Sequence, residues 1–191
     1  MSQGASDSEA ELAARALGGD DRAFAVLVRR HKNGLYGFVR RYVGDGDPAV
    51  EIIQETFVAA WLALRRYDSS RPFAVWLRAI ALNKCRDRAR RATVRRLVFG
   101  DRDPDAPEVQ RQADPMPDAE ATMLQRQRLT RLERAISRLP PKLKEPLLLT
   151  YFEEMSQQQA ADLLGVSVKT VETRIYRARR RLAELLSLDL E

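Results

Sequence analysis

The feature that most limits how this chain can fold is a proline-rich acidic segment, residues 100–118, between two stretches with helical periodicity. Apolar residues in the segment follow no period, and its prolines are Pro104, Pro107, Pro115 and Pro117. Such a composition favours a flexible tether, and a structureless loop of this length is uncommon within one compact domain. An ordered loop packed on one half is the alternative. We therefore predict two domains, 1–98 and 119–191, joined by a flexible linker at 99–118.

Both halves carry the pattern of helices. Apolar residues recur every three or four positions, and no run of alternating β-branched residues is bounded by turn signals. The predicted fold class is therefore all-α, with two small helical domains. Helices are predicted at about 9–17, 20–43, 49–66, 72–96, 119–138, 141–152 and 156–164, with a last helix from 168 onward.

The composition and charge of the chain limit the kinds of partner and site that it can have. The formal net charge is +6 and the sequence pI is about 9.8, which fits a polyanionic partner such as nucleic acid. Cys85 and His31 are the chain's only cysteine and histidine, so an internal disulfide and a Cys/His zinc site are both excluded. We expect no metal, no other cofactor, and no functional role for either residue.

Other patterns are also missing from the sequence. The polar, acidic start MSQGASDSEAEL does not resemble a signal peptide, and no apolar run reaches the length of a membrane helix. Neither a phosphate-cradling glycine loop nor a plausible pair of catalytic carboxylates is evident. We therefore expect a cytoplasmic protein that inserts in no membrane, takes no small-molecule substrate and is not an enzyme.

Residues 156–182 have the pattern of a helix-turn-helix. Ser156 followed by Gln159 is a capping box, which begins a helix. Gly165 fits the left-handed position that ends it, and Ser167 can cap the next helix. The second helix has an apolar stripe formed by Val168, Val171, Ile175, Ala178, Leu182 and Leu185.

The opposite face of this second helix is polar and basic. It carries Lys169, Thr173, Tyr176, Arg177 and Arg180, flanked by Thr170, Glu172, Arg174 and Arg181. In a helix-turn-helix the second helix lies in the DNA major groove, where arginine can pair with guanine and glutamate with a cytosine amino group. The run 179–181 is expected to contact phosphates. A helical hairpin with a solvated basic face is the alternative.

A second basic element lies in the first half. Residues 71–96 contain a single acid, Asp87, against Lys84 and the arginines 71, 78, 86, 88, 90, 91, 95 and 96. This density suits a helix that follows a phosphate backbone, although a solvated face is the alternative. We expect Trp61, Phe73 and Trp76 in the core, and Tyr67 as the aromatic residue that contacts nucleic acid.

Three stretches together resemble one family. DPAVEIIQETFVAAW (47–61) and SSRPFAVWLRAIALNKCRDRARR (69–91) resemble the second conserved region of extracytoplasmic-function sigma factors. LPPKLKEPLLLTYFEEMSQQQAADLLGVSVKTVETRIYRARRRL (139–182) resembles their fourth region. Members of this sigma-70-type family direct bacterial RNA polymerase to promoters. The resemblance implies that 1–98 is a region 2 domain and 119–191 a region 4 domain.

The resemblance also implies partners. Core RNA polymerase would bind through the clamp helices of its largest subunit and the flap of its second-largest subunit, and an anti-sigma factor would be a further partner. The residues that match the family's clamp-binding motif are Glu51, Ile53, Gln54 and Glu55. Val50 stands where the family usually has the first of two acids.

Promoter DNA is the remaining implied partner. The −10 element would be held, as an opened strand, by Tyr67, Ser69, Ser70, Arg71, Asn83, Arg86 and Arg90. The −35 element would be read as duplex by Lys169, Thr170, Glu172, Thr173, Arg174, Tyr176, Arg177 and Arg180. Glu172 stands where many members carry a basic residue.

Two other readings use the same residues. A stand-alone helix-turn-helix regulator would explain 156–182, but the first half shows no strand-containing input domain and such a protein does not need its basic helix. A protein-interaction adaptor would use its basic faces to bind acidic proteins. Binding to core RNA polymerase separates both from a sigma factor.

Overall fold

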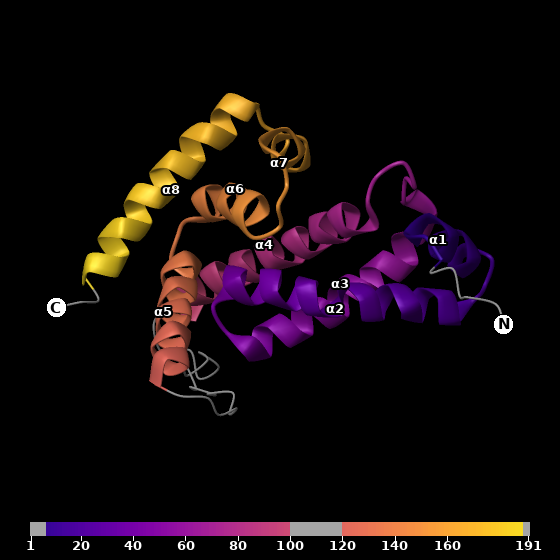
Figure 1. The fold of residues 1–191 in the computed structure, drawn as a ribbon, viewed down its shortest axis with the longest axis horizontal. Helices are drawn as coiled ribbons and strands as arrows, with labels where there is room; N and C mark the ends of the chain where they lie inside the picture. The colour runs from indigo at the N-terminus through magenta and orange to yellow at the C-terminus, as the bar shows by residue number, and fades with distance from the viewer. Residues whose placement is uncertain (1–6, 100–119, 189–191) are drawn as a thin grey trace. The chain divides into compact units, whose positions relative to one another are not determined.

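The computed structural model describes residues 7–99 and 120–188, and within these ranges it contains helices and turns without strands. The all-α prediction is therefore confirmed. The elements in Figure 1 are α1 Glu9–Leu17, α2 Asp21–Val43, α3 Gly46–Ala63, the 3₁₀ helix η1 Leu64–Arg66, α4 Phe73–Phe99, α5 Glu120–Ser137, α6 Pro141–Tyr151, α7 Gln157–Leu164 and α8 Val168–Leu188. Except for its first residue, the predicted linker lies outside the described residues.

The chain divides into two compact units. The first comprises Met1–Val39 and Asp47–Asp87, and the second comprises Arg40–Gly46 and Arg88–Glu191. The predicted domain limits at 98 and 119 stay a prediction.

Local sequence explains the first helices. Ser8 accepts a hydrogen bond from Glu11 N while the Glu11 carboxylate accepts one from Ser8 N, which is a complete capping box for α1. Asp20 then caps α2, because its Oδ1 accepts from Arg22 N at 3.0 Å and Ala23 N at 3.2 Å. These contacts confirm the predicted starts of both helices.

The predicted starts of α3 and α4, both near prolines, differ from the structure. α3 begins at Gly46, three residues earlier than predicted, because Pro48 is tolerated in the first turn, where backbone N–H groups have no intrahelical acceptor. α4 begins at Phe73 and not at Pro72. Pro72 lies just outside the helix, and its carbonyl accepts from Val75 N at 3.0 Å.

The core of the first unit is formed by the apolar faces of its helices. Leu27 and Phe38 of α2 and Phe73 and Leu77 of α4 are completely buried. Side-chain contacts join the helices: Phe24 of α2 meets the Trp61 ring of α3 edge-on, with centroids 4.9 Å apart. Other buried side chains are Leu12, Leu35, Val39, Ile52, Ile53, Phe57, Leu64 and Leu82.

The second unit contains the predicted helix-turn-helix. α8 packs against α5, α6 and α7, and α6 also packs against α7. The apolar stripe predicted for α8 provides this contact, since Val171 and Ala178 are completely buried and Ile175 and Leu182 nearly so. Figure 1 shows α7 next to the first turns of α8, with α6 beside both. The polar face of α8 therefore points away from its own core.

Candidate DNA- and polymerase-binding surfaces

The turn between α7 and α8 forms as the sequence predicts. Ser156 Oγ accepts from Gln159 N at 3.1 Å, and the Gln159 side chain accepts from Ser156 N at 2.9 Å. Gly165 has φ +65°, the left-handed conformation that favours glycine. Ser167 Oγ accepts from Thr170 N at 3.2 Å at the start of α8. Both helices are thus capped at the predicted residues.

The polar face of α8 is exposed over several turns. Tyr176 is 63% exposed, and Lys169, Glu172, Thr173, Arg177 and Arg180 are also exposed. Lys169 Nζ lies 3.4 Å from a Glu172 carboxylate oxygen, so these two predicted DNA contacts form an ion pair in the free chain. Thr170 and Arg174 are half-buried, and the Thr170 hydroxyl is engaged with Ser167 at 2.9 Å. The predicted reading residues share one surface, with these two at its edge.

The predicted polymerase-binding residues divide between two sides of α3. Glu51, Gln54 and Glu55 are exposed, whereas Ile53 is only 6% exposed and packs in the core. Ile53 packs in the unit that α3 covers, so a direct contact of its side chain with polymerase stays a prediction. Glu55 lies 3.4 Å from Lys84 Nζ of α4.

The exposed side of α3 also includes apolar residues that are not among the predicted contacts. Val58 is 60% exposed and Leu62 is 77% exposed, and both continue the line of Glu51 and Glu55 along the helix. Exposed apolar side chains that form a contiguous patch rimmed by polar residues are a feature of partner surfaces. The positions 51, 55, 58 and 62, read at helical spacing, could have revealed this mixed stripe.

The predicted −10 turn, residues 67–72, is closed by its own hydrogen bonds. Tyr67 Oη donates to Arg71 O at 2.7 Å, and Asp68 Oδ1 accepts from Ser70 N at 3.0 Å. This bonding lowers the pKa of the Asp68 carboxyl, whereas burial and the nearby Glu9 carboxylate raise the pKa of Tyr67. Apart from Tyr67, all side chains of the turn are exposed, and those of Ser69, Ser70 and Arg71 are among them.

The aromatic residues around this turn form a cluster. The rings of Tyr67, Phe73 and Trp76 lie 5.2 to 5.4 Å apart. Phe73 is completely buried, Tyr67 and Trp76 are half-buried, and Trp61 is 39% exposed. The core assignment of Trp61 is wrong, because one side of its ring packs on Phe24 while the rest lies at the surface.

The other predicted −10 residues lie on α4. Asn83 and Arg90 are exposed, and Arg86 is half-buried. Arg86 Nη1 lies 3.5 Å from Asn83 Oδ1, so the amide that could contact a base is next to a guanidinium. Arg91 and Arg95 are also exposed. The predicted residues thus extend from the turn along one helix.

His31, which was expected to have no role, lies beside the aromatic cluster of Tyr67, Phe73 and Trp76. Its ring centroid is 5.3 Å from that of Phe73, and its Nε2 is 2.8 Å from a Glu9 carboxylate oxygen. The two atoms are close without the geometry of a hydrogen bond, so Nε2 is buried without a bonded partner. Burial therefore lowers the pKa of His31 below its usual 6.5, against the opposing effect of Glu9 and with the help of Arg78 and Arg30.

We expect the stability of the first unit to fall as the pH drops below about 6.5. The unfolded chain then binds a proton at His31 more readily than the folded chain, so the free energy of unfolding decreases by up to about 1.4 kcal/mol per pH unit. The decrease ends at the lowered folded-state pKa. Urea unfolding of the wild type and of His31→Gln at pH 7.0, 6.0 and 5.0 measures the free energy of unfolding at each pH. Equal pH dependence in the two proteins would contradict this expectation.

Within the described part of the chain, no group of three or more His, Cys, Asp or Glu side chains is placed to hold a metal ion. Among the same residues, no helix has the length and apolar character that a membrane span needs.

Two family models match the chain. Residues 27–95 match sigma-70 region 2, and residues 129–182 match sigma-70 region 4. The first match contains α3, the 67–72 turn and most of α4, while the second contains α6, α7 and much of α8. The order of the matches along the chain is the order that the sequence predicts.

Curated relatives match over nearly the whole chain. The RNA polymerase sigma factor CnrH of Cupriavidus metallidurans is 40% identical over 97% of this chain and 97% of its own length. The ECF RNA polymerase sigma factor SigW of Bacillus subtilis is 31% identical over 88% of this chain and 91% of its own length.

A solved structure agrees with these matches. The structure of CnrH in complex with the cytosolic domain of CnrY covers 96% of this chain and 99% of the solved chain, with a TM-score of 0.67 and 36% sequence identity. The fold, the order of the regions and the sequence agree, and the chain therefore belongs to the extracytoplasmic-function sigma factors of the sigma-70 family.

Proposed function

We propose that this chain binds core RNA polymerase and gives it promoter specificity through two separate DNA contacts. The exposed face of α8 reads the −35 element as duplex, and the 67–72 turn with α4 holds the −10 element as an opened strand. The observation that carries the proposal is the capped α7–α8 pair, which buries one face of α8 and leaves Arg177 and Arg180 exposed on the other.

The polymerase contact is assigned to the exposed side of α3. Glu51, Gln54 and Glu55 supply polar groups, and Val58 and Leu62 supply apolar surface next to them. An interface that combines apolar contacts with charges gives both affinity and orientation. The occupant that we propose is core RNA polymerase, at the clamp helices of its largest subunit, with a second contact between region 4 and the flap of the second-largest subunit.

An anti-sigma factor is a further proposed partner. The relative CnrH was solved with the cytosolic domain of CnrY, and a partner of that type would hold this chain inactive by covering the surfaces that polymerase needs. We place the protein in the cytoplasm, where polymerase and chromosome are. We also infer that it guides an enzyme and catalyses no reaction itself, with no cofactor and no small-molecule substrate.

The test uses the full chain and purified bacterial core RNA polymerase. We expect the two to co-migrate on a sizing column, and the complex to start transcripts at defined sites on fragmented genomic DNA of the source bacterium. Aligned start sites would give the −10 and −35 sequences. Binding to duplex DNA without binding to core polymerase would instead identify a stand-alone regulator. Binding to neither would contradict the proposed function.

A further inference from the structure

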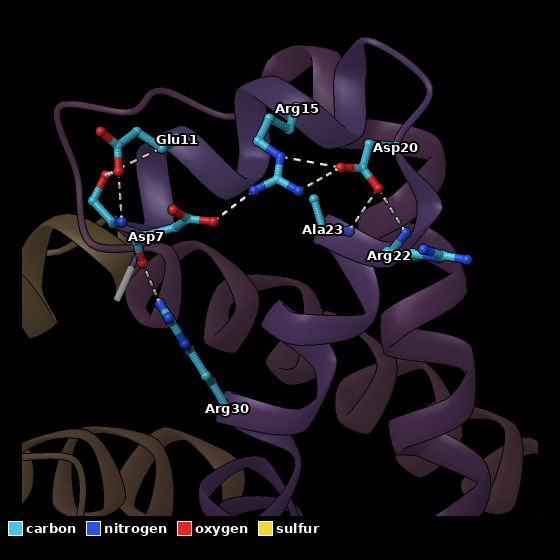
Figure 2. Close-up of polar contacts among 8 residues, drawn as sticks. Asp7, Glu11, Arg15, Asp20, Arg22, Ala23 and Arg30 are labelled. Atoms are coloured by element: carbon cyan, nitrogen blue, oxygen red, sulfur yellow. Dashed lines mark hydrogen bonds and ion pairs between the residues drawn. The ribbon is translucent and has the colours of Figure 1, made fainter. Parts of the chain in front are cut away.

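Helix α1 is held to α2 by a chain of polar contacts (Figure 2). The Arg15 guanidinium lies 2.6 Å from the Asp7 carboxylate and 2.7 Å from that of Asp20, the residue that caps α2. Arg30 Nη1 donates to Asp7 O at 2.8 Å and extends the contact along α2. Exposed ion pairs stabilise little individually, but this set fixes the position of α1 from both of its ends.

From this position Glu9 reaches the start of α4. One carboxylate oxygen accepts a hydrogen bond from Phe73 N at 3.0 Å, across 64 positions in the sequence, and the other lies 2.8 Å from His31 Nε2. Pro72 has no N–H, so the amide of Phe73 is the first donor that α4 presents. Glu9 therefore caps α4 from another helix, with a negative charge at the positive end of the helix.

The capped amide belongs to the residue that attaches the 67–72 turn to the domain. The Phe73 side chain is completely buried and contacts the rings of Tyr67 and Trp76. The turn's own hydrogen bonds fix its internal shape, from Tyr67 to Arg71. Its orientation on the domain depends on both ends, and α1 contacts both, packing on η1 before the turn and bonding Phe73 after it.

We propose that Glu9 is a positioning residue for recognition of the opened −10 strand. By tying the start of α4 to α1 it sets where Ser69, Ser70 and Arg71 present their polar groups. This inference rests on the proposed function, in which those residues contact single-stranded DNA. Because flipped-out bases are recognised by hydrogen bonds and stacking in closely fitted sites, a small rotation of the turn changes which bases fit.

The experiment uses the full chain assembled with core RNA polymerase, and a dye-labelled single-stranded DNA pool with a randomised central segment. Glu9→Ala removes the cap. Glu9→Gln keeps an oxygen acceptor for Phe73 N and serves as the conservative rescue. Glu11→Ala is the matched control, because Glu11 lies on the same helix and forms its hydrogen bonds with Ser8, away from α4.

We expect Glu9→Ala to weaken binding of the pool by up to about tenfold, because losing this charge-assisted hydrogen bond lowers the population of the binding-competent position of the turn. We also expect the bases enriched at one or more positions to change. Core polymerase affinity should stay within twofold of the wild type. Glu11→Ala should keep the wild-type enrichment, and Glu9→Gln should lie closer to the wild type than Glu9→Ala. The enrichment is a readout that a loss of stability alone would not move.

Two results would overturn the proposal. The first is wild-type affinity and wild-type enrichment for Glu9→Ala. The second is an equal change in affinity and enrichment for Glu9→Ala and Glu11→Ala, which would mean that any loosening of α1 alters DNA binding and that the bond from Glu9 to Phe73 has no specific role. A wild-type holoenzyme that enriches no sequence from the pool would contradict the proposed function itself, and Glu9's role would fall with it. This third result is seen without any variant, so the two failures are distinguishable.

Discussion

Replacing Glu55 with lysine is expected to weaken binding to core RNA polymerase by about 30-fold to several thousand-fold. Reversing a charge at a complementary interface costs about 2–5 kcal/mol. In this chain the new lysine would also lie close to Lys84, which now forms an ion pair with Glu55 at 3.4 Å. Because the Glu55 side chain is 52% exposed, the substitution should leave the fold intact. Affinity is measured with labelled chain and purified core polymerase.

A matched charge reversal supplies the control for Glu55→Lys. Glu184 on α8 is a similarly exposed glutamate, 2.7 Å from Arg181, and it lies outside the α3 surface proposed to bind the clamp helices. Glu184→Lys should therefore bind core polymerase within about twofold of the wild type, consistent with the small effect of exposed ion pairs. If the two variants lose affinity equally, net charge explains the effect and α3 is not the contact surface. DNA binding through α8 should survive Glu55→Lys.

The second large effect is expected at Arg177. Arg177→Ala should weaken binding of the holoenzyme to duplex −35 DNA by about 1–3 kcal/mol and relax its preference at one base pair, because a bidentate arginine discriminates against wrong bases by that amount. Arg177 is exposed on the polar face of α8, so its removal leaves the buried stripe unchanged. Fluorescence anisotropy against the matched and single-substituted −35 sequences measures both effects.

Arg179 offers the comparison for this prediction. It is exposed on the same helix but belongs to the run expected to contact phosphates. Arg179→Ala should weaken all duplexes similarly and reduce the slope of log affinity against log salt by about one. If Arg177→Ala lost affinity equally for all duplexes and Arg179→Ala changed the base preference, the roles of the two arginines would be exchanged. Unchanged binding in both would remove this face of α8 from the promoter contact.

Local signals in the sequence were sufficient for most helix limits. Ser8, Asp20, Ser156 and Ser167 accept backbone hydrogen bonds at the starts of their helices. Caps act over three residues, so a sequence read in order contains both partners. The starts of α3 and α4, which differed from the prediction, lie at Gly46 and Phe73, each within two residues of a proline. A proline is acceptable both just before a helix and within its first turn, so it does not specify which of these positions it takes.

Exposure was harder to predict than helix type. Ile53 and Trp61 both lie on α3 at positions compatible with an apolar stripe, yet one is 6% and the other 39% exposed. Periodicity places residues on a face of a helix, but the width of the face that neighbouring helices cover depends on how those helices pack. For the same reason the exposure of Val58 and Leu62 became evident only in the folded unit.

The sequence by itself determined the helical class, the order of the two regions, the capped turn at Gly165 and the identity of the α8 stripe. The order of the regions follows from motifs along the chain, and the other three features depend on residues a few positions apart, whose spacing is set by helix geometry. Tertiary structure alone decided that Glu9 bonds Phe73 and lies beside His31. No local pattern marks an acceptor that meets its donor 64 positions later, because packing of α1 in the first unit brings the two together.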